Sequence, residues 1–72
     1  DYPGKEIAIK TQYAWDQQFN SIINVVYGNE WNAGNLSYHL KSRPIWKGFV
    51  KREKLDELRD YMCFDGVCVG SK

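Results

Sequence analysis

The chain is poor in the residues that bind metals and cross-link secreted domains. Its 72 residues include two cysteines and one histidine, His39. A structural zinc site needs about four thiolate or imidazole ligands, so this set is too small and we expect no metal. One cysteine pair is also sparse for a small secreted domain, and we therefore expect Cys63 and Cys68 to be reduced thiols. Their spacing around an Asp-Gly pair nevertheless permits a disulfide across a tight turn.

Long apolar runs are absent as well. No stretch approaches the roughly 20 apolar residues of a membrane-spanning helix, so we expect a domain that is not inserted in a membrane. Residues 1–10 lack the basic and then apolar order of a signal peptide. The sequence has no initiator methionine, and we expect residues 1–72 to be one domain, a processed fragment or an excised piece of a longer protein. A chain of this length has room for one small hydrophobic core.

No group of residues forms a catalytic or cofactor-binding pattern. His39 lies on the polar side of its segment, and no nucleophile or carboxylate is placed near it by spacing, so a solvent-exposed histidine is the simpler interpretation. Asp56, Glu57 and Asp60 resemble a cation site only in composition, because acidic residues on a helix exterior usually just contact water. We expect no enzyme activity, no cofactor and no small-molecule substrate.

Apolar and polar residues alternate more often than they follow helical spacing. This alternation predicts five strands, at residues 6–11, 21–27, 36–40, 44–51 and 67–70, with 21–27 central in the sheet. Leu55, Leu58 and Met62 predict an amphipathic helix over residues 52–62. We expect one or two helical turns within residues 13–20 and a loop over residues 28–35. The predicted fold class is α+β, a small antiparallel-sheet sandwich with helices on one face.

Positive charge is concentrated in one part of the chain. Residues 41–54 carry six cations against Glu53, a balance of +5, whereas residues 1–40 and 55–72 each carry −2. If residues 44–51 are extended, alternate side chains share a face, which groups Lys47, Phe49 and Lys51. Cations bind phosphates and unpaired bases stack on aromatic rings, so this face suits single-stranded RNA, bound weakly. We expect these three residues to be central, with supporting charge from Lys41, Arg43, Arg52 and Lys54.

A simpler interpretation of the same residues stays open. Phe49 could be covered by the helix that follows it, and lysines on an edge strand often serve only to prevent association between strands. Pro44 favours an edge strand or a strand start, because it cannot donate to a sheet ladder. The domain would then be a protein-interaction or spacer domain. A third class is a secreted effector or toxin held by a disulfide between Cys63 and Cys68.

The order of the predicted elements is similar to that of a known family. A strand "GFVK" that runs into the amphipathic helix "REKLDELRDYM", followed by a turn and the closing strand "GVCV", resembles the C-terminal subdomain of the SARS-unique region of betacoronavirus non-structural protein three. The early "EIAIKTQYAW" also looks similar, so the likeness, one of pattern and length, spans almost the whole chain. No RNA-contacting residue is carried over from that family, and Cys63 and Cys68 have no match in it.

This resemblance implies a frataxin-like α+β fold within a viral replicase polyprotein, just before the ubiquitin-like part of the papain-like protease. It implies a location in the host cytoplasm, at the cytosolic face of replication membranes, with the neighbouring domains as partners. It further implies a non-enzymatic module that binds single-stranded RNA or tunes the RNA preference of those neighbours.

Overall fold

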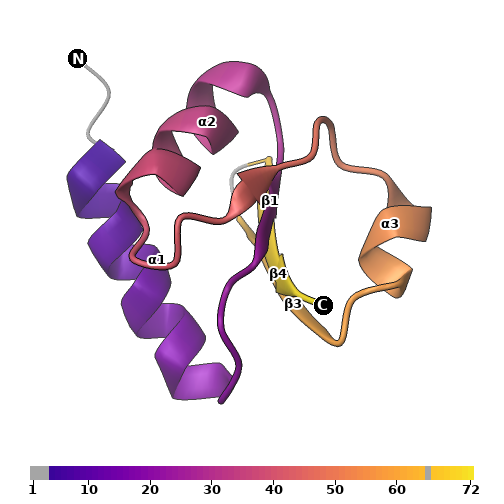
Figure 1. Cartoon of the computed structure of the whole chain (residues 1–72), viewed down its shortest axis with the longest axis horizontal. Helices are drawn as coiled ribbons and strands as arrows, with labels where there is room; N and C mark the ends of the chain where they lie inside the picture. The colour runs from indigo at the N-terminus through magenta and orange to yellow at the C-terminus, as the bar shows by residue number, and fades with distance from the viewer. Residues whose placement is uncertain (1–3, 65) are drawn as a thin grey trace.

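Three helices and four strands are formed within residues 4–64 and 66–72, the parts of the chain that the computed structural model describes. In chain order they are α1 (Gly4–Gln18), β1 (Val25–Tyr27), α2 (Glu30–His39), β2 (Ile45–Trp46), α3 (Arg52–Asp56), β3 (Asp60–Phe64) and β4 (Val67–Ser71). These elements pack into a small α+β domain, so the predicted class is confirmed (Figure 1).

The four strands form one mixed sheet in the order β2-β1-β4-β3. β1 pairs in parallel with β2, while β4 is antiparallel to both β1 and β3. Parallel neighbours cannot be joined by a tight turn, and α2 supplies the crossover between β1 and β2. The expected antiparallel sheet is therefore correct for three strands, and β2 is the exception. The strand expected over residues 21–27 forms only at Val25–Tyr27, but β1 lies inside the sheet as expected, and β2, which follows Pro44, lies at its edge.

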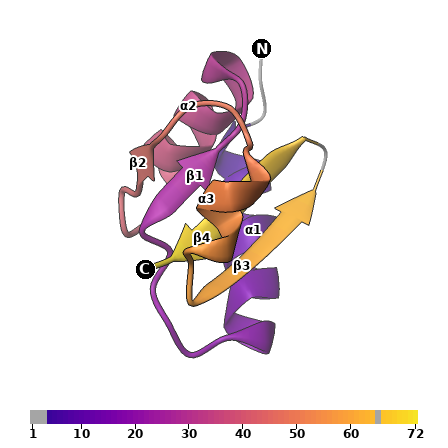
Figure 2. The ribbon, with the colours of Figure 1, turned by 90° about the vertical axis from the view of Figure 1, so that its right-hand side faces the viewer.

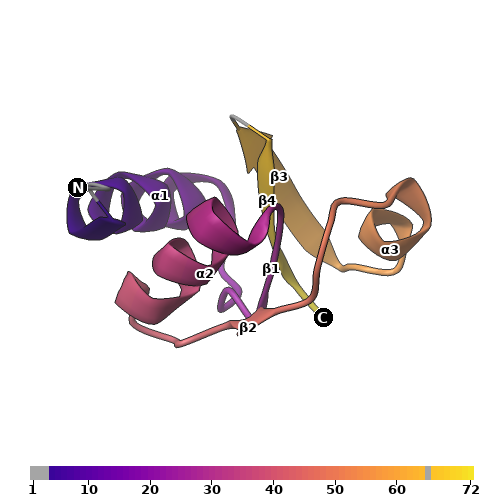
Figure 3. The same cartoon turned by 90° about the horizontal axis from the view of Figure 1, so that it is seen from above.

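The helices cover both faces of the sheet (Figures 2 and 3). α1 and α2 pack on the first face, where Trp15, Leu36 and Val69 belong to the larger core cluster. α3 packs on the second face, where Leu55 joins Val25, Tyr27 and Cys68 in a smaller cluster. Successive strand residues point to opposite faces, so both faces of β1 and β4 are apolar. The prediction of helices on one face only is wrong.

Residues 6–11 form part of α1 and not the expected strand. Their alternation placed Ile7 and Ile9 together, but Ile9 is exposed in the structure. The buried residues of α1 are Gly4, Ala8, Thr11 and Trp15, which recur at helical spacing. The helical turns expected within residues 13–20 are confirmed as the end of this longer helix. The local sequence is compatible with a strand or with a helix, and the packing of Trp15 in the core favours the helix.

α2 replaces the expected loop at 28–35 and the expected strand at 36–40. The side chain of Asn29 accepts a hydrogen bond of 2.8 Å from the backbone N–H of Asn32, which caps the first turn of the helix. Ala33, Leu36 and Leu40 are buried at positions i, i+3 and i+7. The Asn and Gly residues that indicated a reversal therefore start a helix, since Asn is also a preferred N-cap.

The helix predicted for residues 52–62 is much shorter. α3 ends at Asp56, and the following backbone N–H groups of Glu57 and Leu58 bond to residues three positions earlier. Residues from Asp60 onward instead pair with β4, and Met62 packs against the larger core cluster from β3. The full ladder with β4 outweighs the weak local preference of a short helix. The closing strand predicted at 67–70 is confirmed as β4.

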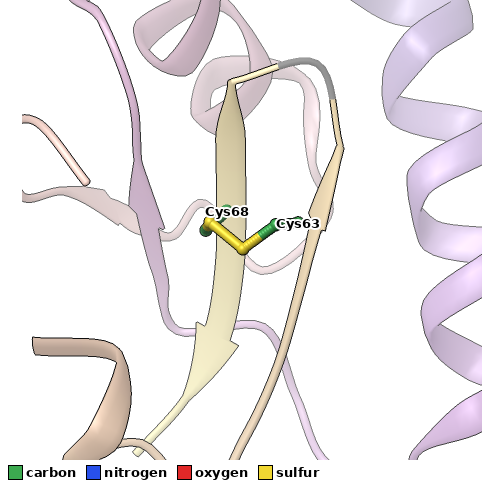
Figure 4. Close-up of a disulfide and its surroundings, with 2 residues drawn as sticks. All are labelled: Cys63 and Cys68. Carbon is green, nitrogen blue, oxygen red and sulfur yellow. A yellow bond between two sulfur atoms is a disulfide. The ribbon is translucent and has the colours of Figure 1, made fainter. Parts of the chain in front are cut away.

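The hairpin of β3 and β4 carries a disulfide between Cys63 and Cys68 (Figure 4). The two residues are directly opposite in the register, with their Cα atoms 4.0 Å apart. The expectation of reduced thiols is wrong for this structure, because cross-strand pairing brings the two residues within bonding reach. Cys68 is buried in the smaller core cluster, as expected for an apolar strand residue.

Candidate nucleic-acid interface

The basic segment, residues 41–54, runs along one edge of the domain. It leaves the end of α2, forms a turn, passes through the edge strand β2 and continues through a loop into α3 (Figure 3). It therefore joins the layer of α1 and α2 to the layer of α3. All of its cationic side chains belong to exposed residues: Lys41, Arg43, Lys47, Lys51, Arg52 and Lys54.

Backbone hydrogen bonds hold the centre of this segment against β1. The N–H groups of Ile45 and Lys47 donate to Asn24 and Val26, at 3.1 and 3.0 Å. The carbonyl of Gly48 accepts from the N–H of Gly28 at 2.8 Å, so the pairing continues two residues beyond β2. These bonds tie residues 45–48 to β1 and to the residues on either side of it.

Trp46 anchors the same region to the core. Its ring packs against the larger cluster, and its indole N–H donates to the carbonyl of Gly28 at 2.8 Å. Because strand residues alternate, Ile45 and Lys47 point to the opposite side, toward the face that carries α3. Ile45 is 65% exposed, which leaves an apolar side chain beside Lys47 on the surface.

The strand does not extend through residue 51, so that expectation is wrong. Gly48 has φ of 93°, a left-handed conformation that L side chains rarely adopt, and Phe49 follows in a bend. The alternation that grouped Lys47 with Phe49 and Lys51 ends at this glycine. These three residues remain neighbours in the chain, but a shared strand face no longer supports their grouping.

Phe49 is 70% exposed, which excludes the interpretation that it is covered by the following helix. Leu55, and not Phe49, packs against the sheet from α3, in the smaller core cluster. An exposed phenyl ring does not gain the free energy that burial of its apolar surface would give. In the sequence this ring lies between Lys47 and Lys51. Such a ring is available to stack on a planar ligand.

The cations of the basic segment are not neutralised by close carboxylates. Among residues 4–64 and 66–72, the salt bridges are Lys10 with Glu6 and Arg59 with Asp60, both at 3.8 Å. Neither includes a cation of the basic segment. The local positive potential is therefore available to an anionic partner.

A second exposed ring lies at the other end of the segment. The guanidinium of Arg43 lies 4.7 Å from the centroid of the Tyr38 ring, and Tyr38 is 64% exposed. Arg43 has φ of 48°, and its N–H donates to the carbonyl of Leu40 at 3.1 Å. The sequence-based prediction missed Tyr38, because it was assigned to a strand. The position of Tyr38 just before the basic segment is the feature of the sequence that could have indicated a role for this ring.

None of the helices within residues 4–64 and 66–72 has the length and the apolar character needed to span a bilayer. No group of three His, Cys, Asp or Glu side chains in this part of the chain is placed to hold a metal ion.

Comparison of the chain with known protein families, with curated proteins and with solved structures found no match.

Proposed function

We propose that this domain binds single-stranded RNA through the basic segment and catalyses no reaction. The observation that carries the proposal is the exposed ring of Phe49 in a segment that carries six exposed cations, none of which has a carboxylate partner in the described residues. The cations attract phosphates, and the ring offers a stacking surface for one base. Stacking on an aromatic side chain contributes about 1–3 kcal/mol per base, and it is tolerant of base identity.

Binding by this segment is expected to be weak and to depend strongly on salt. Each phosphate contact on a single strand contributes a slope of about −0.7 to the dependence of log K on log salt concentration. Six contacts would give a slope of about −4, and three contacts a slope of about −2. The measured slope therefore counts how many cations of the segment engage at once.

The resemblance to the SARS-unique subdomain supports the same function. Under this proposal the domain is a frataxin-like module of a viral replicase polyprotein in the host cytoplasm, with the neighbouring domains as further partners. The Cys63–Cys68 disulfide is the observation that weighs against this location, because the cytosol keeps thiols reduced.

Titration of the isotopically labelled domain with a single-stranded RNA of about ten nucleotides tests the proposal, at about 50 and about 200 mM salt. We expect NMR shifts concentrated in residues 41–54 at low salt that weaken strongly at high salt. The double variant Lys47→Gln, Lys51→Gln should bind more weakly and with a smaller salt slope. Lys5→Gln, on α1, is the control for a lost exposed charge.

The contribution of the ring is tested separately. Phe49→Ala should weaken binding by about fivefold or more, since one stacked base is lost. Tyr13→Ala is the matched control, because Tyr13 is 69% exposed and lies on α1, away from the basic segment. Equal losses in both variants, or no shifts in residues 41–54 even at low salt, would favour the protein-interaction or spacer function instead.

The disulfide favours a second candidate, a secreted effector that acts in an oxidising compartment. Mass spectrometry of the chain, purified without reductant from its native source, distinguishes the two. A mass lower than that of the reduced chain by the two thiol hydrogens supports the effector. The full reduced mass supports an intracellular module.

A further inference from the structure

A cleft opens on the side of the domain opposite to α3. It lies between α1, α2 and the β3–β4 hairpin and has a volume of about 510 Å³. Its size falls in the range of about 300–1,000 Å³ that is usual for small-molecule sites. Most of its wall is apolar: Ile7 and Ala14 from α1, Leu36 from α2, and Met62, Phe64 and Val67 from the hairpin.

Thr11 places a hydroxyl in this apolar wall. The residue is only 4% exposed, and its side chain forms no hydrogen bond with the described residues. Thr11 lines the cleft, and no fully enclosed side-chain oxygen or nitrogen among the described residues lacks a partner, so the unpaired Thr11 hydroxyl is reached by solvent. A hydroxyl that bonds only to water in an apolar cleft can exchange that water for a ligand group.

Two other polar side chains line the same cleft. Asn32 uses its backbone N–H for the cap of α2, whereas its half-buried side-chain amide has no hydrogen-bond partner in the described residues. Lys10 is exposed and makes only a long contact with Glu6, 3.8 Å between Nζ and Oε1. An exposed pair of this kind is weak, so the Lys10 ammonium is available to another anion.

We propose that this cleft binds a small amphipathic carboxylate, such as a medium-chain fatty acid. Its hydrocarbon body lies against Leu36, Met62 and Phe64, where it displaces water from an apolar surface. Its carboxylate accepts hydrogen bonds from the Thr11 hydroxyl and the Asn32 amide, and it pairs with Lys10. The positive charge of Lys10 selects an anionic head over a neutral or cationic one. This site does not include any residue of the basic segment and is independent of RNA binding.

Titration of the domain with decanoate tests the site, with decanol and decylamine as probes that share the chain but not the head group. We expect saturable NMR shifts at the cleft residues with decanoate, weaker binding of decanol and still weaker binding of decylamine. Lys10→Gln should weaken decanoate by about twofold to fivefold and leave decanol unchanged. Thr11→Val, which keeps the side-chain shape, should weaken decanoate by about fivefold. Ala14→Leu should fill the cleft and weaken both probes.

Lys5→Gln is the control for charge, because Lys5 is an exposed lysine of α1 that does not line the cleft. The urea midpoint of every variant shows whether it is folded. The proposal is overturned if decanoate shifts no cleft residue, or if Lys5→Gln and Lys10→Gln weaken it equally. It is also overturned if decylamine binds as tightly as decanoate. Shifts at the cleft that grow with protein concentration in the absence of decanoate would assign the cleft to self-association instead.

Discussion

Gly70 in β4 lies close to Leu58, which follows α3 in the chain. A Cβ atom added to Gly70 would overlap Cδ1 of Leu58 and would lie 3.3 Å from Cγ of Leu58 and 3.2 Å from the carbonyl oxygen of Asp60. Leu58 packs against the smaller core cluster just after α3. The absent side chain of Gly70 therefore makes room for the residue that holds this layer against the sheet.

Gly70→Ala should destabilise the domain by about 1–2 kcal/mol. Overpacking costs about 1–3 kcal/mol, and the lower entropy of the unfolded alanine chain offsets about 0.4–1 kcal/mol of it. For a domain of this size the expected fall in the melting temperature is about 5–15 °C. Urea denaturation followed by tryptophan fluorescence measures the change, because Trp15 is completely buried.

Leu58→Ala tests the reason for this loss. With Leu58 shortened, only the contact with the Asp60 carbonyl remains, and Gly70→Ala should then cost less than about 0.5 kcal/mol. Gly34→Ala in α2 is the control for glycine replacement, because its added Cβ meets no atom within 4 Å. It should stabilise the domain by about 0.5–1 kcal/mol, as expected for a helix interior. If the Gly70 and Leu58 substitutions are additive, Leu58 does not occupy the space above Gly70 and the reasoning is refuted.

Two further predictions concern local features of the fold. Reduction of the Cys63–Cys68 disulfide, which closes a loop with a sequence separation of 5, should lower the free energy of unfolding by about 2 kcal/mol. An unchanged urea midpoint under reductant would contradict this loss of loop-closure stabilisation. Asn29→Ala should cost about 1 kcal/mol because it removes the N-cap of α2, whereas Asn29→Asp keeps the acceptor oxygen and should cost little. Equal losses in these two variants would show that the cap does not stabilise the helix.

The sequence determined those features that depend on composition and on neighbouring residues. The share of apolar residues predicts one small core, and the β-branched run before Tyr27 predicts β1 inside the sheet. The exposure of the cations in residues 41–54 also follows from their charge. The α+β class was therefore predictable. Residues 6–11 and 36–40, however, were predicted as strands and belong to or adjoin helices in the structure.

Prediction from local pattern failed where a segment was compatible both with the alternation of a strand and with the spacing of a helix. Residues 6–11 alternate as a strand would, yet the burial of Ala8, Thr11 and Trp15 makes them helical. Residues 28–40 carry turn-forming Asn and Gly together with Ala33 and Leu36 at helical spacing, and packing against the sheet favours the helix. Helices of this length gain most of their stability from the face that they bury, and the burying surface belongs to distant residues.

Only the tertiary structure decided what lies together at the proposed sites. It exposed the ring of Phe49, placed Arg43 over Tyr38, and brought α1 and the β3–β4 hairpin together around the cleft. The pairing of Cys63 with Cys68 likewise required the register of β3 with β4. Composition and short-range spacing determine which residues prefer water. Which of them face one another depends on strand register and on which side of the sheet each helix packs, and contacts between residues distant in the sequence decide both.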